Sequence, residues 1–227
     1  MRGKWRPWVA AFGLFAGTSA WAYRPYDSTD ADVASERETE IELGLRAADD
    51  GAGHEQAIDA VLNIGIGQGR EIVVEGQWLH SSVEDVGVFL KQVHRHGSLQ
   101  DESGLSVASE CGALIPTSAD ESGPGGECAL ILSHATAWVA LHLNTGVTYR
   151  TDHRWSNSIA LILEAPDEWR IRPGMEVLRE SDESTLLLGV AGKLGEALQI
   201  DFGYRRTIDP SSYPSEWRVG ITWRRER

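Results

Sequence analysis

The sequence predicts an all-β fold of about twelve antiparallel strands, each of roughly ten residues. Three observations indicate this: an alternation of apolar and polar residues from about residue 38 to residue 223, turn-forming clusters that interrupt it, and an export signal at the N-terminus. In segment 141–150 the odd positions are apolar or amphipathic and the even positions carry His, Asn, Gly, Thr and Arg. Segments 39–46, 198–205 and 217–223 repeat the pattern. Each such strand has one apolar and one polar face.

The first 22 residues have the features of a secretory signal peptide. Arg2, Lys4 and Arg6 precede an apolar run, and Ala20-Trp21-Ala22 places small residues at the cleavage positions. The run is too short for a transmembrane helix, which needs about 20 apolar residues. We therefore expect residues 1–22 to be removed and residues 38–227 to form one barrel domain. Between them we expect residues 23–37 to be a flexible periplasmic lead, and entry of this segment into the lumen is the alternative that the sequence leaves open.

The connections between strands help to decide which face is inside. In a soluble β-sandwich the apolar faces form a core, whereas in an outer-membrane barrel they meet lipid and the polar faces line the interior. Such barrels have short turns at the periplasmic end and longer loops outside. The alternation of long and short connections holds for the long segments 47–55, 117–126, 151–157 and 208–215 and for the short segments 67–70, 134–137, 165–168 and 193–196. Segments 96–103 and 82–85 depart from it.

Six of the nine tryptophans fall at predicted strand ends. Amphipathic rings collect at both lipid–water interfaces, so a two-ended set predicts two aromatic girdles, although any single tryptophan could instead be core filler. The predicted periplasmic group is Trp138, Trp169 and Trp223, and the predicted outer group is Trp78, Trp155 and Trp217.

The predicted register turns charges of both signs into the lumen. A slip of one residue would turn four arginines toward hydrocarbon, at a cost of about 2 to 4 kcal/mol each near the midplane. We expect the lumen to be narrow or occluded, as a polar pore or as a plug of ion pairs. The expected lumen-lining residues are Glu40, Glu42, Asp59, Glu71, Glu75, Lys91, Glu110, His142, Asn144, Arg150, Glu164, Arg172, Glu176, Asp201, Arg205 and Arg218.

Short motifs along residues 23–224 resemble one bacterial family. They are Arg24-Pro25 followed by Thr29-Asp30, Ile115-Pro116-Thr117, the segment 141–146, and Gly220-Ile221-Thr222-Trp223-Arg224. The chain resembles the outer-membrane proteins named for the MetA pathway of phenol degradation, which are often called transporters. The resemblance implies a barrel in the outer membrane, and the family name suggests hydrophobic or aromatic solutes. One departure is the C-terminus, because barrels commonly end in an aromatic residue that the insertion machinery reads, whereas here Arg224 to Arg227 follow Trp223.

Residues that could carry chemistry do not form a reaction centre in the sequence. His142 and Asn144 share an inner face that Ser106 or Ser133 could approach, but there is no G-x-S-x-G motif. Polar lumen residues that hydrogen-bond to one another explain this set better. His94-Arg95-His96 lacks a third metal ligand nearby. We therefore expect no enzymatic activity, no catalytic residue, no metal and no cofactor.

Cys111 and Cys128 are the only cysteines, and export permits a disulfide between them. Closing the roughly 16 residues between them would stabilise the fold by about 3 kcal/mol in the entropic model. The alternative is two independent small side chains on the lipid-facing surface.

The net charge of −13 argues against a nucleic-acid partner. We expect contacts with outer-membrane lipid and lipopolysaccharide, with the barrel-insertion machinery and with an unidentified small solute. The expected function is a transporter or channel for small, hydrophobic or aromatic solutes. The alternatives are an envelope scaffold whose lumen is sealed by ion pairs and, less favoured, an outer-membrane hydrolase or a soluble periplasmic β-sandwich.

Overall fold

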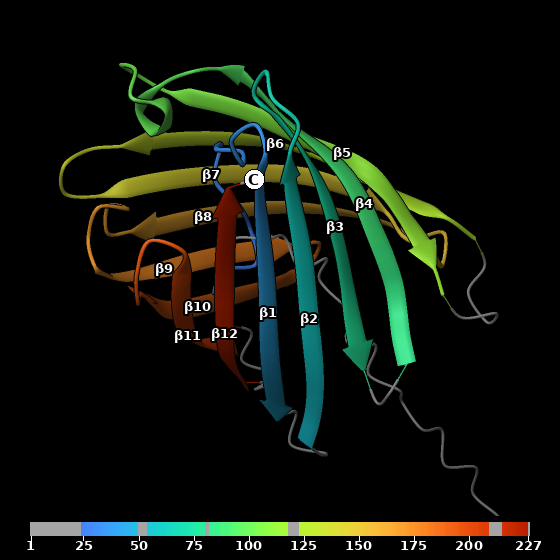
Figure 1. Cartoon of the computed structure of the whole chain (residues 1–227). Coiled ribbons are helices and arrows are strands. Elements are labelled where there is room, and N and C mark those ends of the chain that lie inside the picture. The colour runs from blue at the N-terminus through green and yellow to red at the C-terminus, as the bar shows by residue number, and fades with distance from the viewer. Residues whose placement is uncertain (1–23, 50–53, 80–81, 118–122, 209–214, 227) are drawn as a thin grey trace, which may run out of the picture.

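Twelve antiparallel strands form one closed barrel in the computed structural model, which describes residues 24–49, 54–79, 82–117, 123–208 and 215–226 (Figure 1). Each strand pairs with its neighbours in the chain, and β1 pairs with β12 to close the sheet. This confirms the predicted all-β, up-and-down barrel of about twelve strands. The predicted signal peptide, residues 1–22, lies outside the described residues.

The strands are regular in length, and a short 3-10 helix, η1 (Ser98–Gln100), follows β4. Within the described ranges no helix is long and apolar enough to span a membrane. The strands are β1 (Glu38–Asp49), β2 (His54–Gly65), β3 (Arg70–Leu79), β4 (Ser82–Arg95), β5 (Ser106–Pro116), β6 (Gly125–Ala135), β7 (Ala140–Tyr149), β8 (Trp155–Glu164), β9 (Ile171–Glu180), β10 (Glu183–Lys193), β11 (Leu198–Thr207) and β12 (Ser215–Glu226).

The barrel has two ends, which we call the terminal end, where β1 begins and β12 finishes, and the far end opposite it. The predicted alternation of long and short connections is only partly right. The β5–β6 and β11–β12 connections at the far end are long, but only residues 181–182 join β9 to β10 there. The segment 47–55 was predicted to be a loop, yet Ala47 pairs with Gln56 as part of the β1–β2 ladder. The pairing of β1 with β2 thus reaches Asp49 and His54, beyond the end of the apolar pattern.

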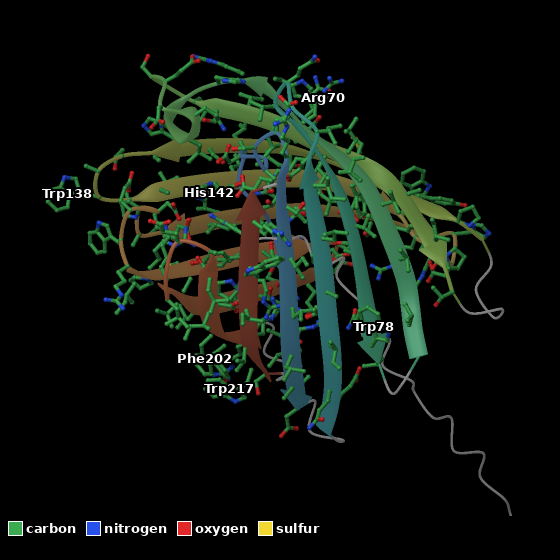
Figure 2. The ribbon with its side chains drawn as sticks, viewed as in Figure 1. Arg70, Trp78, Trp138, His142, Phe202 and Trp217 are labelled. Carbon is green, nitrogen blue, oxygen red and sulfur yellow. A yellow bond between two sulfur atoms is a disulfide. The ribbon has the colours of Figure 1, made fainter. Side chains whose placement is uncertain are left out.

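The outer surface of the barrel is apolar. Leu43 and Leu45 on β1 and Leu141 and Leu143 on β7 are exposed, while the residues between them point inward. Figure 2 shows Trp138 at the turn after β6 and Trp78 and Trp217 on strands near the other end. The six predicted girdle tryptophans are all exposed, with Trp138, Trp169 and Trp223 toward the terminal end and Trp78, Trp155 and Trp217 toward the far end.

Part of the barrel interior is filled by apolar side chains of the wall. Val61, Val73, Phe89 and Leu114, from β2 to β5, form one buried cluster. This side of the lumen is therefore closed by the strands themselves.

Cys111 and Cys128 lie directly opposite each other in the β5–β6 ladder and are joined by a disulfide. Both side chains belong to the outward-facing set of their strands, between inward residues such as Glu110 and Glu127. The C-terminal residues Arg224 and Arg225 pair with β1, so they extend the last strand.

We expect the double substitution of Cys111→Ser and Cys128→Ser to lower the free energy of unfolding by about 3 kcal/mol, because the disulfide constrains the unfolded chain. The measurement is the urea midpoint of unfolding in detergent, followed by intrinsic tryptophan fluorescence. Reductant should shift the unsubstituted chain by the same amount and leave the double variant unchanged. An unchanged midpoint in the double variant would contradict the disulfide.

Candidate functional site in the barrel lumen

The chain in front of β1 runs through the inside of the barrel. Pro25 to Thr29 are buried, and Ala31 is fully buried. In Figure 1 this segment is the blue coil within the ring of strands. We call residues 24–36 the N-terminal plug. Of the two alternatives for residues 23–37, burial supports entry into the lumen for residues 25–31, whereas residues 35–37 are exposed; residue 23 lies outside the described residues.

The first contact of the plug is made by Arg24 with two buried carboxylates. Its Nε lies 3.3 Å from Oδ2 of Asp201 on β11, and its Nη1 lies 3.9 Å from Oδ2 of Asp59 on β2. Arg46 also contacts Asp59, at 2.8 Å. We call Asp59 and Asp201 the acidic subsite. Because buried charges are costly without partners, Arg24 stabilises this part of the wall.

The second contact has the opposite polarity and is made by Asp27. Its carboxylate lies 2.6 Å from Nη1 of Arg218 and 3.3 Å from Nε of Arg205. The backbone N–H groups of Asp27 and Ser28 donate to the carboxylate of Glu176, at 2.8 and 2.9 Å. We call Arg205 and Arg218 the basic subsite. The plug is thus held by charges of both signs within a few residues.

The third contact involves Lys91 on β4, which is buried. Its Nζ donates to the Thr29 hydroxyl at 3.0 Å and lies 3.6 Å from Asp30 and 3.5 Å from Glu71. Glu71 in turn accepts the backbone N–H of Ala34 at 2.6 Å. Lys91 and Glu71 therefore clamp the part of the plug that returns toward the terminal end.

A row of inward-facing glycines receives the start of the plug. Gly44 pairs with Gly220, and Gly189 pairs with both Gly203 and Gly174. A Cβ at Gly44 or Gly220 would overlap the Arg24 side chain, one at Gly189 would overlap Pro25, and one at Gly174 would overlap the Tyr26 hydroxyl. We call these five residues the glycine groove. It crosses β1, β12, β11, β10 and β9, and it lets the plug lie directly against the backbone.

All of the predicted lumen-lining residues lie on the inward face, buried or half-buried. Those in contact with the plug are Asp59, Glu71, Lys91, Asn144, Glu176, Asp201, Arg205 and Arg218. Most of the others form ion pairs or hydrogen bonds within the barrel wall. Glu40 pairs with Arg224, Arg150 with Glu180 and Arg172 with Glu164, and Glu42 accepts a hydrogen bond from Asn63. Glu75 and Glu110 are also buried. The plug residues were not predicted individually, because the segment before β1 has no strand periodicity to assign it a face. Arg46 was also not named, although the alternation of segment 39–46 places it on the same face as Glu40 and Glu42.

Ser133, His142 and Glu164 lie in a row that superficially matches a hydrolase. Nδ1 of His142 lies 2.8 Å from the Ser133 hydroxyl, and Nε2 lies 3.5 Å from Glu164. A nucleophile must meet its substrate, but the Ser133 oxygen is fully buried and accepts the backbone N–H of Ala31 at 2.9 Å. Figure 2 places His142 within the ring of strands. Ser133 therefore binds the plug, as does Asn144, whose amide donates to the Thr29 carbonyl at 2.8 Å.

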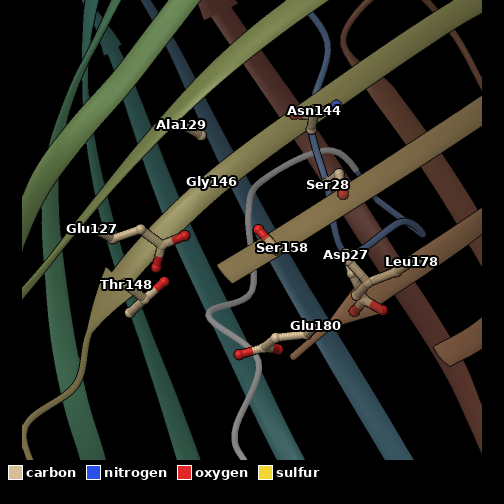
Figure 3. A pocket seen from close by; sticks show the side chains of 10 residues that line it. All are labelled: Asp27, Ser28, Glu127, Ala129, Asn144, Gly146, Thr148, Ser158, Leu178 and Glu180. Atoms are coloured by element: carbon tan, nitrogen blue, oxygen red, sulfur yellow. The ribbon is translucent and has the colours of Figure 1, made fainter. Parts of the chain in front are cut away.

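A small cavity of about 30 Å³ remains between the plug and strands β6 to β9. Asp27 and Ser28 form part of its lining, and Glu127, Thr148 and Ser158 face them from the wall (Figure 3). This volume is sufficient for one or two water molecules. Water at this position would solvate the far-end side of the plug.

At the terminal end, Asp167 ties the β8–β9 turn to two neighbouring strands. Its carboxylate lies 2.8 Å from Arg172 on β9 and 2.8 Å from Lys193 on β10. Burial raises the pKa of Asp167, but the hydrogen bond from Lys193 and the charge of Arg172 outweigh burial and hold the pKa below its usual range. Among the described residues, no group of three or more His, Cys, Asp or Glu side chains is arranged to hold a metal ion.

Comparison with known proteins relates the fold to outer-membrane channels. No family model and no curated protein matches the sequence. The KdgM porin in complex with disordered oligogalacturonate is 12% identical, with a TM-score of 0.66 over 81% of this chain and 98% of that one. An outer-membrane channel from Pseudomonas putida F1 is 9% identical, with a TM-score of 0.63 over 88% and 99%. The CymD monoaromatic hydrocarbon channel is 9% identical, with a TM-score of 0.51 over 93% of both chains.

The chain therefore has the fold of outer-membrane channel barrels. The narrower resemblance to the family named for the MetA pathway stays a prediction.

We expect Gly189→Val to displace the plug, because its branched side chain would occupy the position of Pro25. Overpacking of this kind costs about 1 to 3 kcal/mol, which corresponds to roughly 5- to 150-fold in a docking equilibrium. A cysteine introduced at the buried Ser28 would report the change as a faster reaction with a maleimide in detergent.

The matched control is Gly192→Val on the same strand, where a Cβ would meet only Ile200 at 3.9 Å. Equal labelling rates in the two variants would show that the glycine groove does not seat the plug.

Proposed function

We propose that this chain is an outer-membrane channel for small solutes whose lumen is closed by its own N-terminal plug. The observation that carries the proposal is the way the plug is held. It joins the barrel covalently only at β1, and it adds no strand to the sheet apart from an isolated bridge at Tyr26. Its polar contacts are ion pairs and hydrogen bonds, which water can replace. A filler of this kind can leave the lumen without unfolding the barrel.

The outer surface supports a location in the outer membrane. Its exposed leucines, valines and isoleucines would meet lipid, and the two groups of tryptophans would lie at the interfaces with water and lipopolysaccharide. In this orientation the terminal end faces the periplasm. A cleaved signal peptide and the barrel-insertion machinery would bring the chain there.

Passive movement of solute would follow displacement of the plug. Neither catalysis nor a cofactor is part of this proposal. The resemblance of the sequence to the MetA-pathway family supports hydrophobic or aromatic solutes, and the cluster of Val61, Val73, Phe89 and Leu114 would offer them an apolar wall.

A second candidate function is a non-transporting scaffold with a permanently sealed lumen. It is favoured by the burial of Tyr26 against Ile162 and Leu187, since this apolar contact does not exchange readily for water. In that case the plug would act as the core of the barrel.

Deletion of residues 24–33 separates the two functions. We expect the deleted chain to remain a heat-modifiable barrel on electrophoresis and to open discrete currents in planar bilayers, because the lumen loses its filler. The intact chain should be closed, or conduct at least about tenfold less, when the plug is stable by about 1.4 kcal/mol or more.

Arg218→Gln in the intact chain should give intermediate, flickering currents, since it weakens the grip on Asp27 without deleting any chain. A deleted chain that shifts on boiling but carries no current would favour the scaffold.

A further inference from the structure

We propose that the lumen wall beneath the plug is a solute-binding site and that residues Arg24 to Asp27 occupy it as an internal mimic of the solute. The ligand class is a small molecule with a cationic group and an anionic group joined by a short apolar or aromatic body, such as a short peptide. This inference rests on the proposed channel function, because it requires the plug to leave.

The acidic subsite defines one end of this site. The side chain of Asp201 is fully buried, and in the described part of the chain its ion pair is with Arg24. Asp59 keeps Arg46 as a partner when the plug is absent, whereas Asp201 loses its ion pair with Arg24 and is opened to the vacated lumen. A carboxylate on the low-dielectric wall of a lumen attracts a cation more strongly than a carboxylate in bulk water does. The vacated wall therefore selects a positive group at this position.

The basic subsite defines the other end. Arg205 forms an ion pair with Asp27, while Arg218 is shared between Asp27 and Glu216. Departure of the plug leaves both guanidinium groups facing the lumen with less than their full set of acceptors. Guanidinium groups bind carboxylates with strong, directional hydrogen bonds, so an anionic group is the matching ligand here.

The surface between the subsites fits an apolar or aromatic body. Pro25 lies against Gly189 and Gly203, and Tyr26 packs with Ile162 and Leu187. Glycine leaves a flat backbone surface against which a ring can lie at van der Waals distance. Arg24 and Asp27 are three positions apart, so the chain between them spans at most about 10 to 11 Å. The ligand is thus a short molecule.

This arrangement also discriminates by charge pattern. A polyanion would satisfy Arg205 and Arg218 but would bring like charge toward Asp59 and Asp201. A neutral hydrocarbon would leave both subsites without partners, so among aromatic solutes this site selects those that carry both charges. A ligand with its charges in the reversed order would meet repulsion at both ends.

The test uses the chain that lacks residues 24–33 and the blocked peptide acetyl-Arg-Pro-Tyr-Asp-amide, with acetyl-Asp-Pro-Tyr-Arg-amide as the reversed control. Calorimetric titration in detergent should show the first peptide binding at least about tenfold more tightly than the second. Asp201→Asn and Arg218→Gln should each remove most of this preference. Matched charge removals at the terminal end, Asp167→Asn and Lys193→Gln, should preserve it.

Equal affinity of the two peptides, or no binding of either, would overturn the inference. Conductance of the deleted chain without peptide reports separately on the channel, so a chain that conducts but ignores the peptides would refute only the binding site. A chain that binds the first peptide but does not conduct would refute the channel.

The intact chain provides a second measurement in case the deleted chain does not fold. With the cysteine at Ser28, the first peptide should compete with the plug and raise the rate of maleimide labelling, whereas the reversed peptide should not. Identical rates with both peptides would also overturn the inference.

Discussion

The structure depends on one constraint, which is that charges turned into the lumen of a closed barrel must find partners there. Closure pairs β1 with β12 and removes every sheet edge, so the wall itself is complete. Its inner face nevertheless carries buried Asp201 and Arg218, whose desolvation must be offset by opposite charges. The N-terminal segment supplies these charges in the required order. Barrel and plug are therefore complementary halves of one electrostatic arrangement.

The two sides of the lumen are filled by different parts of the chain. On β2 to β5 the wall fills the space with its own apolar side chains, as in the packing of Phe89 against Val61 and Leu114. On β9 to β12 and β1 the inner face includes the glycine groove, and the space that it leaves is occupied by Arg24 to Tyr26. Only the second side can be emptied by the movement of a single segment. The interior is thus divided into a fixed half and an exchangeable half.

The sequence predicts the barrel well because a period of two is a local property. In β7 the alternation alone assigns His142 and Asn144 to the inside and Leu141 and Leu143 to the outside, as the structure has them. The plug was the open question, since its contacts, such as Asp27 with Glu176, join residues 149 positions apart and leave no periodic trace. The glycine groove was missed for a related reason: Gly44 and Gly220 become neighbours only through the register of β1 and β12. Loop lengths were overestimated where strand pairing outlasts the apolar pattern.

The position of Arg24 has a consequence for the order of assembly. Its side chain lies against Gly44 and Gly220, which are partners across the seam where the first and last strands of the chain meet. Gly220 does not reach the Arg24 side chain until β12, the last of the twelve strands to be synthesised, has paired with β1. Arg24 can therefore dock against both glycines only after the barrel has closed, and its docking distinguishes a closed barrel from an open sheet that is still being assembled.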